Sequence, residues 1–218
     1  MGKIYILTKG QKIILDGIKS QEYISSNFYF TGGTALSEYY LRHRYSEDLD
    51  FFTEKEFDHG IIFSIIRKLS KKYGFEFKSE AVASVYMFYI QFPKRPGIKV
   101  DFNHYDFKRL DKSINREGLH IDSLLDIATN KLLTITQRND VKDFVDFYYL
   151  EPKFGIWDLI EGVKVKFRME LELDLLASDL LKIEDFTNLP KMIKPLKLSV
   201  LQKFFRQKAK EVGRRAVI

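Results

Sequence analysis

Two consecutive glycines, Gly32 and Gly33, constrain the fold of this chain more than any other feature of its sequence. They follow a short aromatic segment, residues 27–30, of the kind that forms a strand. Glycine adopts backbone conformations that other residues avoid, so the pair predicts a sharp turn. Thr34 is a residue type that often caps a helix, and we expect it to be the N-cap of a helix over residues 35–42.

Two aspartates, Asp48 and Asp50, belong to the next strand-like segment, residues 48–52. Alternate side chains on a strand share a face, so the two carboxylates are predicted to lie together. Neighbouring carboxylates repel each other unless they share a proton or a cation. The chain has no cysteine, which excludes a disulfide scaffold, a thiolate zinc site and a cysteine nucleophile. The four histidines are too scattered for a zinc site, so oxygen ligands favour Mg²⁺ or Mn²⁺.

A third acid, Asp101, alternates with apolar residues in a later strand-like segment, residues 98–102. If this strand lies beside residues 48–52, the three carboxylates can hold two metal ions for in-line displacement at phosphorus. Backbone amides of a glycine turn at a helix N-terminus bind phosphate. Each piece has an ordinary alternative, a simple turn or a surface pair of acids. In this order they predict a site for a nucleoside triphosphate.

The remaining periodicity divides the chain into two halves. We predict an α+β fold, in which residues 1–110 form a short mixed sheet with flanking helices and residues 111–218 form a helical C-terminal subdomain. The active site is expected in the cleft between them. The elements expected in the first half are helices at 8–26 and 58–73 and strands at 74–78, 84–92 and 98–102, the last two as a hairpin. Strand patterns end near residue 110, and helices are then expected at 122–137, 140–150 with Asp140 as cap, 155–168, 170–182 and 195–211.

Positive charge is concentrated at the C-terminal end of the 218-residue chain. Residues 191–218 contain nine Lys or Arg and a single acid, a net charge of +8, whereas the whole chain carries +6. This distribution predicts a basic arm that binds a polyanion such as nucleic acid; a solvated helix face is the ordinary alternative. We find no signal peptide and no transmembrane segment, and the absence of cysteine fits a reducing compartment, so we expect a cytoplasmic protein.

The run Phe-Thr-Gly-Gly-Thr-Ala-Leu at 30–36 and the run Arg-Tyr-Ser-Glu-Asp-Leu-Asp-Phe at 44–51 resemble the AbiEii/AbiGii-type nucleotidyltransferase toxins. These toxins are a branch of the DNA polymerase β-like nucleotidyltransferase superfamily. The resemblance continues to Lys131 on a later helix and to a segment with Arg138, Asp143 and Asp146. It covers roughly residues 27–150.

The resemblance implies roles for the matching residues. It implies that Asp48, Asp50 and Asp101 hold Mg²⁺ or Mn²⁺, with Asp101 also a candidate base for the acceptor hydroxyl. It also implies that Gly32, Gly33, Thr34 and Lys131 bind the NTP, and that either Asp143 or Asp146 assists the reaction.

Several residues keep two interpretations. Lys131 and Arg138 lie seven positions apart and share a helix face, which either neutralises the triphosphate or is simply solvated. Arg44 and Ser46 either bind phosphate or fix the loop before the metal-binding strand. For Asp143, a salt bridge that orders the cleft is an alternative to direct catalysis.

The resulting hypothesis is a metal-dependent enzyme that transfers an NMP from an NTP to an acceptor and releases pyrophosphate. The resemblance implies the toxin of a toxin–antitoxin or phage-defence system, with RNA (tRNA) as acceptor and a cognate antitoxin protein as partner. One alternative is transfer to a small molecule such as an aminoglycoside, or to a protein hydroxyl. Another is a catalytically idle module that binds RNA or antitoxin.

Overall fold

The computed structural model describes residues 6–216. These residues form two compact units. Residues 6–40, 46–108 and 112–122 make up the first unit, and residues 41–45, 109–111 and 123–216 make up the second. The division therefore differs from the boundary predicted at residue 110, because a short segment after the glycine turn belongs to the second unit and the segment up to residue 122 belongs to the first.

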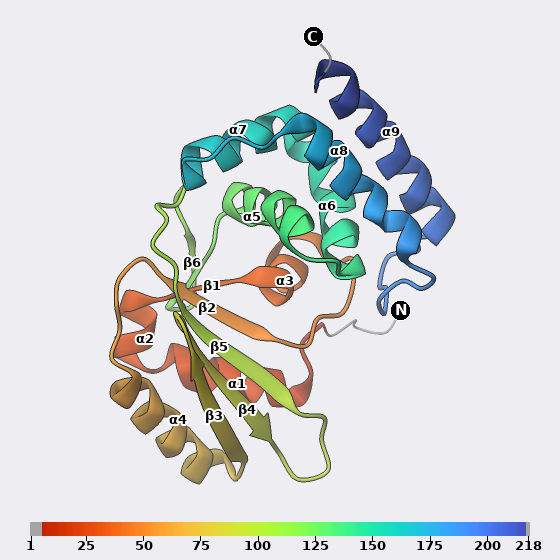
Figure 1. Cartoon of the computed structure of the whole chain (residues 1–218). Coiled ribbons are helices and arrows are strands. Elements are labelled where there is room, and N and C mark those ends of the chain that lie inside the picture. Colours follow the sequence, from red (N-terminus) through yellow and green to blue (C-terminus); the bar gives the residue numbers. More distant parts are fainter. Residues whose placement is uncertain (1–5, 217–218) are drawn as a thin grey trace. The chain divides into compact units, whose positions relative to one another are not determined.

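A seven-stranded mixed sheet is the framework of the first unit (Figure 1). Its strand order is β3-β4-β5-β2-β1-β7-β6. The central pair β2–β5 is parallel, as is β1–β7, whereas β1–β2, β3–β4 and β4–β5 are antiparallel. The strands are β1 (Tyr29–Thr31), β2 (Leu49–Thr53), β3 (Glu76–Val82), β4 (Val85–Gln91), β5 (Ile98–His104), β6 (Ile114–Arg116) and β7 (Leu119–Ile121).

The expectation that strands end near residue 110 was wrong. The short strands β6 and β7 form an antiparallel hairpin, and β7 pairs in parallel with β1. Each has three residues, too few for an alternating pattern to stand out in the sequence. Parallel pairing with a strand some ninety residues earlier is a tertiary contact that local periodicity does not report.

Helices of the first unit are mostly those expected. The segment predicted as one helix over residues 8–26 forms two helices, α1 (Lys9–Lys19) and α2 (Glu22–Asn27). The helix α4 (His59–Tyr73) begins at the N-cap Asp58 and ends at Gly74 in a left-handed conformation. The glycine turn leads into α3 (Gly32–Ala35) and a π-helical continuation η1 (Leu36–Leu41).

One face of the outer strands is covered by helices and the other is open. On β4, Tyr86, Phe88 and Ile90 are buried, whereas Tyr89 is 44% exposed. The buried face meets α4, where the ring of Phe63 packs on Phe77 of β3 with centroids 5.6 Å apart. Alternation along β4 thus separates a core face from a face that carries the polar residues.

The second unit consists of helices packed around an aromatic core. Phe144 and Phe147 on α6 contact Phe205 on α9, with ring centroids 5.0 and 5.9 Å apart. All three side chains are fully buried and form the core of this unit. The elements are α5 (Leu124–Gln137), α6 (Val141–Phe154), α7 (Ile156–Phe167), α8 (Leu173–Leu181), the 3-10 helix η2 (Lys182–Asp185) and α9 (Leu198–Ala216).

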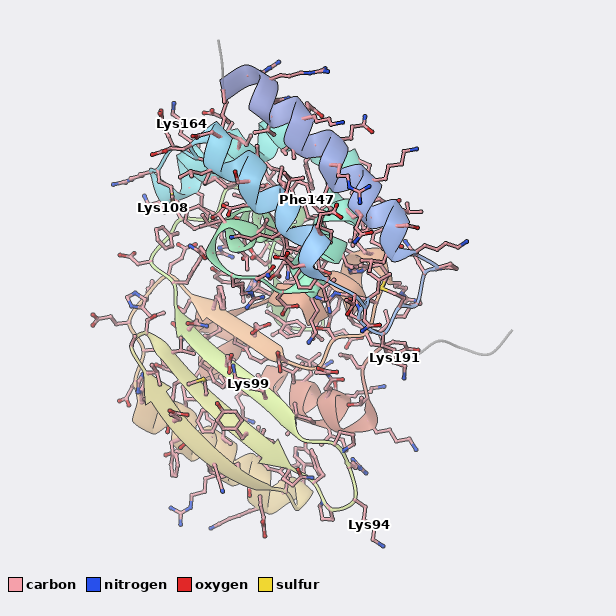
Figure 2. The ribbon with its side chains drawn as sticks, turned by 45° about the vertical axis from the view of Figure 1, so that its right-hand side comes forward. Lys94, Lys99, Lys108, Phe147, Lys164 and Lys191 are labelled. Carbon is pink, nitrogen blue, oxygen red and sulfur yellow. The ribbon has the colours of Figure 1, made fainter. Side chains whose placement is uncertain are left out.

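The predicted basic arm is in fact largely the packed helix α9. Its residues Leu201, Phe205, Ala209 and Val212 are buried, and the helix lies against α8. The basic side chains occupy its outer side, as sticks on this helix show in Figure 2. Within residues 6–216, no helix is long and apolar enough to cross a membrane.

Candidate active site

Two of the predicted metal ligands lie side by side on the central strands. Asp50 on β2 and Asp101 on β5 are register partners in the parallel pair, so their side chains project from the same face of the sheet. Asp48 directly precedes β2, two residues before Asp50. The strand at 98–102 therefore does lie beside the strand at 48–52, as the three-acid hypothesis requires.

The Asp101 carboxylate is buried and only half satisfied. The side chain of Lys99 donates to its Oδ2 at 2.6 Å, whereas its Oδ1 is buried and has no hydrogen-bond partner among residues 6–216. Burial raises the pKa of Asp101 and the charge of Asp48 adds to this, although Lys99 opposes both. An anionic carboxylate with one unpaired oxygen in a buried position is a donor group suited to a cation.

The glycine turn touches the same carboxylate cluster. Gly32 has φ +73°, and a Cβ built on it would come within 2.1 Å of Oδ2 of Asp50. Glycine is therefore required here both by the backbone conformation and by the contact with the acid. The glycine turn and the segment with Asp48 and Asp50 are therefore in contact at Gly32 and Asp50.

Thr34 is not the helix N-cap that was predicted from the sequence. The N-cap of α3 is Thr31, and Thr34 lies inside the helix. Its hydroxyl is fully buried and donates to the backbone carbonyl of Asp48. The side chain thus fixes the start of β2 relative to the glycine turn.

The residues at this site fit a divalent cation in their chemistry but do not form a closed ligand set. Their donors are carboxylate oxygens, which suit Mg²⁺ or Mn²⁺, and Asp101 Oδ1 has no hydrogen-bond partner in the described part of the chain. Within residues 6–216, no three His, Asp or Glu side chains are already arranged to hold a metal ion. The pair Asp50 and Asp101 is therefore in place, while a complete three-acid site would require movement of side chains.

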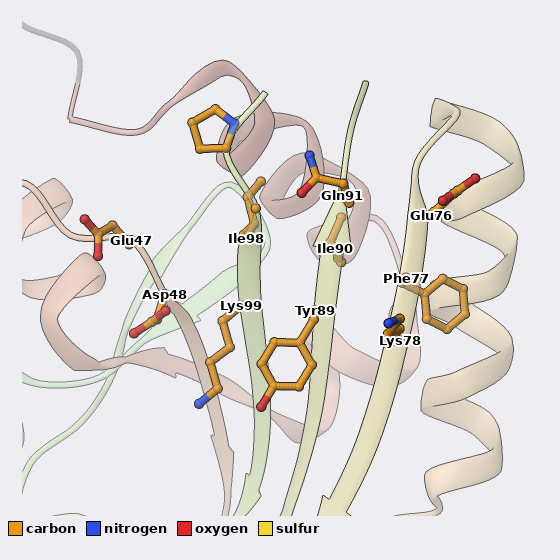
Figure 3. A pocket seen from close by; sticks show the side chains of 12 residues that line it. Glu47, Asp48, Glu76, Phe77, Lys78, Tyr89, Ile90, Gln91, Ile98 and Lys99 are labelled. Carbon is orange, nitrogen blue, oxygen red and sulfur yellow. The ribbon is translucent and has the colours of Figure 1, made fainter. Parts of the chain in front are cut away.

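A pocket of about 700 Å³ opens beside Asp48 on the uncovered face of β3, β4 and β5 (Figure 3). Lys78, Tyr89 and Lys99 line it from three adjacent strands. Other lining residues are Glu47, Glu76, Phe77, Ile90, Gln91, Pro96, Gly97 and Ile98.

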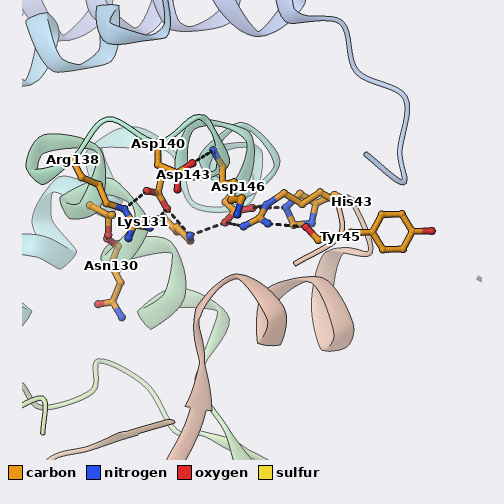
Figure 4. Close-up of polar contacts among 11 residues, drawn as sticks. His43, Tyr45, Asn130, Lys131, Arg138, Asp140, Asp143 and Asp146 are labelled. Atoms are coloured by element: carbon orange, nitrogen blue, oxygen red, sulfur yellow. Dashed lines mark hydrogen bonds and ion pairs between the residues drawn. The ribbon is translucent and has the colours of Figure 1, made fainter. Parts of the chain in front are cut away.

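A separate cluster of buried charges lies in the second unit, centred on Asp146 (Figure 4). Its carboxylate accepts two hydrogen bonds from Arg44, from Nε at 2.6 Å and Nη2 at 2.7 Å, and contacts His43 Nε2 at 2.7 Å. Lys131 Nζ lies 2.7 Å from Oδ2. Burial alone would raise the pKa of Asp146, but Lys131 and Arg44 hold it well below its usual range.

Asp143 joins the same cluster from the preceding turn of α6. It accepts from Lys131 Nζ at 2.7 Å and from Arg138 Nε at 2.7 Å. Burial favours its neutral form, but these two cations lower the pKa of Asp143 overall. The N-cap of α6 is Asp140, as expected. The ion-pair interpretation of Asp143 therefore matches the geometry.

Lys131 and Arg138 converge on one carboxylate, although Arg138 lies just beyond the end of α5 as its C-cap. Arg44, only 1% exposed, pairs with Asp146 and donates to the carbonyl of Tyr45, which fixes the loop. Ser46 presents its backbone carbonyl to Gln11 Nε2 at 3.0 Å. These contacts favour the loop-fixing interpretation of Arg44 and Ser46.

Several polar residues were not predicted from the sequence. Lys99 lies two positions before Asp101 on the same strand face, a spacing that was available as a signal. His43 is fully buried, and burial lowers its pKa despite the contact with Asp146. A second buried pair, Lys166 Nζ to Asp126 Oδ1 at 2.6 Å, had no recognisable signal because forty residues separate its members.

Known proteins resemble this chain over nearly its whole length. It matches the family described as "Nucleotidyl transferase AbiEii toxin, Type IV TA system" over residues 13–214. It is 35% identical over 214 residues to the uncharacterized protein aq_aa25 of Aquifex aeolicus (strain VF5), covering 94% of this chain and 97% of that protein.

Solved structures of similar fold are also found. JHP933 from Helicobacter pylori has a TM-score of 0.59 at 20% identity, covering 96% of this chain and 94% of that one. The nucleotidyltransferase toxin MenT4 of Mycobacterium tuberculosis H37Rv has a TM-score of 0.55 at 15% identity, with coverages of 92% and 82%. These matches confirm the predicted nucleotidyltransferase-like α+β fold. Since the family match extends over most of the sequence, this chain belongs to the AbiEii family of nucleotidyltransferase toxins and is a nucleotidyltransferase.

Proposed function

We propose that this nucleotidyltransferase uses a divalent metal ion to transfer an NMP from an NTP to a hydroxyl of an RNA, with tRNA as the first candidate. The observation that carries the proposal is the register of Asp50 and Asp101 beside Gly32. Two carboxylates on adjacent strands, one with an unpaired buried oxygen, support a site for a hard cation. The neighbouring glycine turn supports a phosphate-binding role for the amides of Gly32 and Gly33.

In this proposal Asp48, Asp50 and Asp101 would hold Mg²⁺ or Mn²⁺. When bound, such ions neutralise the charge that develops on the transferred phosphoryl group and on the leaving pyrophosphate. The Asp101 carboxylate is the candidate acceptor for the proton of the attacking hydroxyl, because burial raises its pKa. The hydroxyl oxygen then bonds to the α-phosphorus, and pyrophosphate leaves.

Binding of the triphosphate by Lys131 and Arg138 stays a prediction of the resemblance. Lys131 is 7% exposed and already pairs with two carboxylates. A phosphate would therefore have to replace one of these partners. The ion pairs favour a role in which Asp143 and Asp146 orient the lysine rather than react themselves.

The choice of RNA as acceptor is supported by the outer side of α9. Lys203, Lys210 and Arg214 are exposed and make no ion pair within residues 6–216. Other basic residues of this region are occupied, since Arg206 pairs with Glu184 and Lys208 with Glu151. The family's place in type IV toxin–antitoxin systems favours a cognate antitoxin and a contribution to phage defence.

The test is to incubate the protein with each labelled NTP, Mg²⁺ and total RNA, and separately with cell protein. We expect label on RNA in a metal-dependent reaction, and loss of at least about 10³-fold in rate for Asp50→Ala. The matched control is Asp16→Ala, which removes a half-exposed acid on α1. Label on protein would mean that the acceptor is a protein and not RNA. Metal-dependent transfer by Asp50→Ala would contradict the proposed metal site.

A further inference from the structure

The pocket on the open face of β3, β4 and β5 lies beside the acid cluster and is lined by an exposed aromatic ring and two lysines. Lys78, Tyr89 and Lys99 are register partners, Lys78 with Tyr89 and Tyr89 with Lys99. They therefore form one row across three adjacent strands, with the aromatic ring between two ammonium groups (Figure 3). Asp48 lies beyond Lys99 in the same pocket.

The exposed ring of Tyr89 has no structural partner that explains it. The side chain is 44% exposed, although its strand neighbours Phe88 and Ile90 are buried. No ring in the described part of the chain packs against it, and its hydroxyl makes only a long contact of 3.7 Å to the sulfur of Met87. An exposed aromatic flanked by cations is the arrangement on which single-stranded nucleic acid stacks, because bases have π faces and phosphates need positive charge.

Strand order separates this pocket from the proposed phosphate-binding turn. In the order β3-β4-β5-β2-β1, the acids lie on β5 and at β2. Gly32 follows β1 on one side of them, and Tyr89 on β4 lies on the other side. An in-line displacement needs the donor and the attacking hydroxyl on opposite sides of the transferred phosphoryl group.

From this arrangement we propose that the pocket binds the single-stranded end of the acceptor RNA, with Tyr89 stacking on a base and Lys78 contacting a flanking phosphate, whereas Lys99 is paired with Asp101. The inference rests on the proposed function and identifies the acceptor side of the same site. The pocket volume of about 700 Å³ lies within the range of small-ligand sites and suits one nucleotide unit. Strands about 4.8 Å apart put Lys78 directly beside the ring, on the side away from the pair of Lys99 with Asp101.

The first test separates the two substrates kinetically. With wild-type protein, deacylated tRNA and NTP, we compare KM for RNA and KM for NTP with those of Tyr89→Ala. Loss of base stacking predicts a rise of about tenfold or more in the KM for RNA, with the KM for NTP within about twofold of wild type. Tyr89→Phe keeps the ring and is expected to recover most of the affinity.

Lys78→Gln tests the phosphate contact. It is expected to raise the KM for RNA about threefold and to lessen its salt dependence by about one phosphate contact. Lys71→Gln on α4 is the matched control, since it removes the same charge from an exposed position outside the pocket. If these variants raised the KM for NTP instead, the pocket would be a donor site. If Tyr89→Ala left both KM values unchanged, the pocket would have no role in binding RNA. Either result overturns the inference.

A second readout does not depend on turnover. An RNA with a 3′-terminal 4-thiouridine is irradiated with the protein without NTP or metal, and the adduct is mapped by mass spectrometry. We expect it in the peptide that contains residues 85–91. If the wild type transfers no label to RNA, RNA is not the acceptor, but the crosslinking result still tests the pocket. Absence of the adduct overturns the inference. Presence of the adduct supports the pocket as a site that binds RNA.

Discussion

Replacing Asp146 with Asn tests whether the buried charge cluster stabilises the second unit. Arg44 and Lys131, which are 1% and 7% exposed, both rely on this carboxylate. Removing one member of a buried ion pair leaves an uncompensated charge, which costs about 3–5 kcal/mol. That loss shifts the folding equilibrium by roughly 2–4 orders of magnitude and is a large part of the stability of an ordinary domain.

The assay is a urea titration at pH 7.5, followed by tryptophan fluorescence. Trp157 is the only tryptophan of the chain. It lies on α7 in the second unit, donates to Glu211 at 3.0 Å and lies below the guanidinium of Arg215. Its emission therefore reports the unit that contains Asp146.

The control is Asp143→Asn in the same cluster. After this change Lys131 keeps Asp146, and the Arg138 side chain, 58% exposed, reaches water. We expect a loss below about 2 kcal/mol, because the exposed partner is screened by solvent. A stability of Asp146→Asn within about 1 kcal/mol of wild type, or equal losses in the two variants, would exclude a special stabilising role of Asp146.

The pH dependence provides an independent check of Asp146. Its pKa in the folded protein is well below the ordinary value, so the unfolded chain binds the proton more readily. The stabilisation is therefore fully present above the ordinary carboxyl pKa and disappears as the pH falls through the folded-state pKa. The stability difference between wild type and Asp146→Asn should stay constant from pH 8 to about pH 5 and shrink only below about pH 4.

Two further predictions concern the glycine turn and α9. Gly32→Ala adds a Cβ 2.1 Å from Asp50 Oδ2, so both the free energy of unfolding and the transfer rate should fall, the former by more than about 1 kcal/mol beyond the control Gly74→Ala. Gly74 shares the positive φ but has nothing within 4 Å, so equal losses in urea titrations of the two variants would exclude the contact as the cause. On α9, replacing three basic residues with Gln, namely Lys203, Lys210 and Arg214, should weaken RNA binding. Fluorescence anisotropy should also show the slope of log affinity against log salt reduced by about 2. The control replaces three basic residues of α4 with Gln, namely Arg67, Lys68 and Lys71. An equal loss of RNA affinity in this control would mean that the position of the charges on α9 does not matter for RNA binding.

The packing of α9 also changes how its role can be tested. Deleting residues 191–218 would remove Leu201, Phe205 and Val212, which are buried in the core of the second unit. Loss of RNA binding by that truncation would therefore reflect unfolding as much as loss of charge. Substitutions at exposed positions separate these two effects.

Local signals in the sequence were enough to predict many of the helices and strands. Gly32 and Gly33 marked the turn, the alternation around Asp50 and Asp101 identified two strands, and most helices were predicted from apolar periodicity or capping. Such patterns are readable because a helix or strand places neighbouring residues in fixed directions. The family motif added roles for these residues that geometry alone does not provide.

Contacts between distant groups, in contrast, follow from the three-dimensional fold. It paired β2 with β5 in the register that joins Asp50 to Asp101, and it put the chain of Gly32 against Asp50. It also assigned Arg44 to Asp146 and buried both. These contacts depend on long-range pairing and on the desolvation of charges, which are properties of the whole fold and leave no periodic trace in the chain.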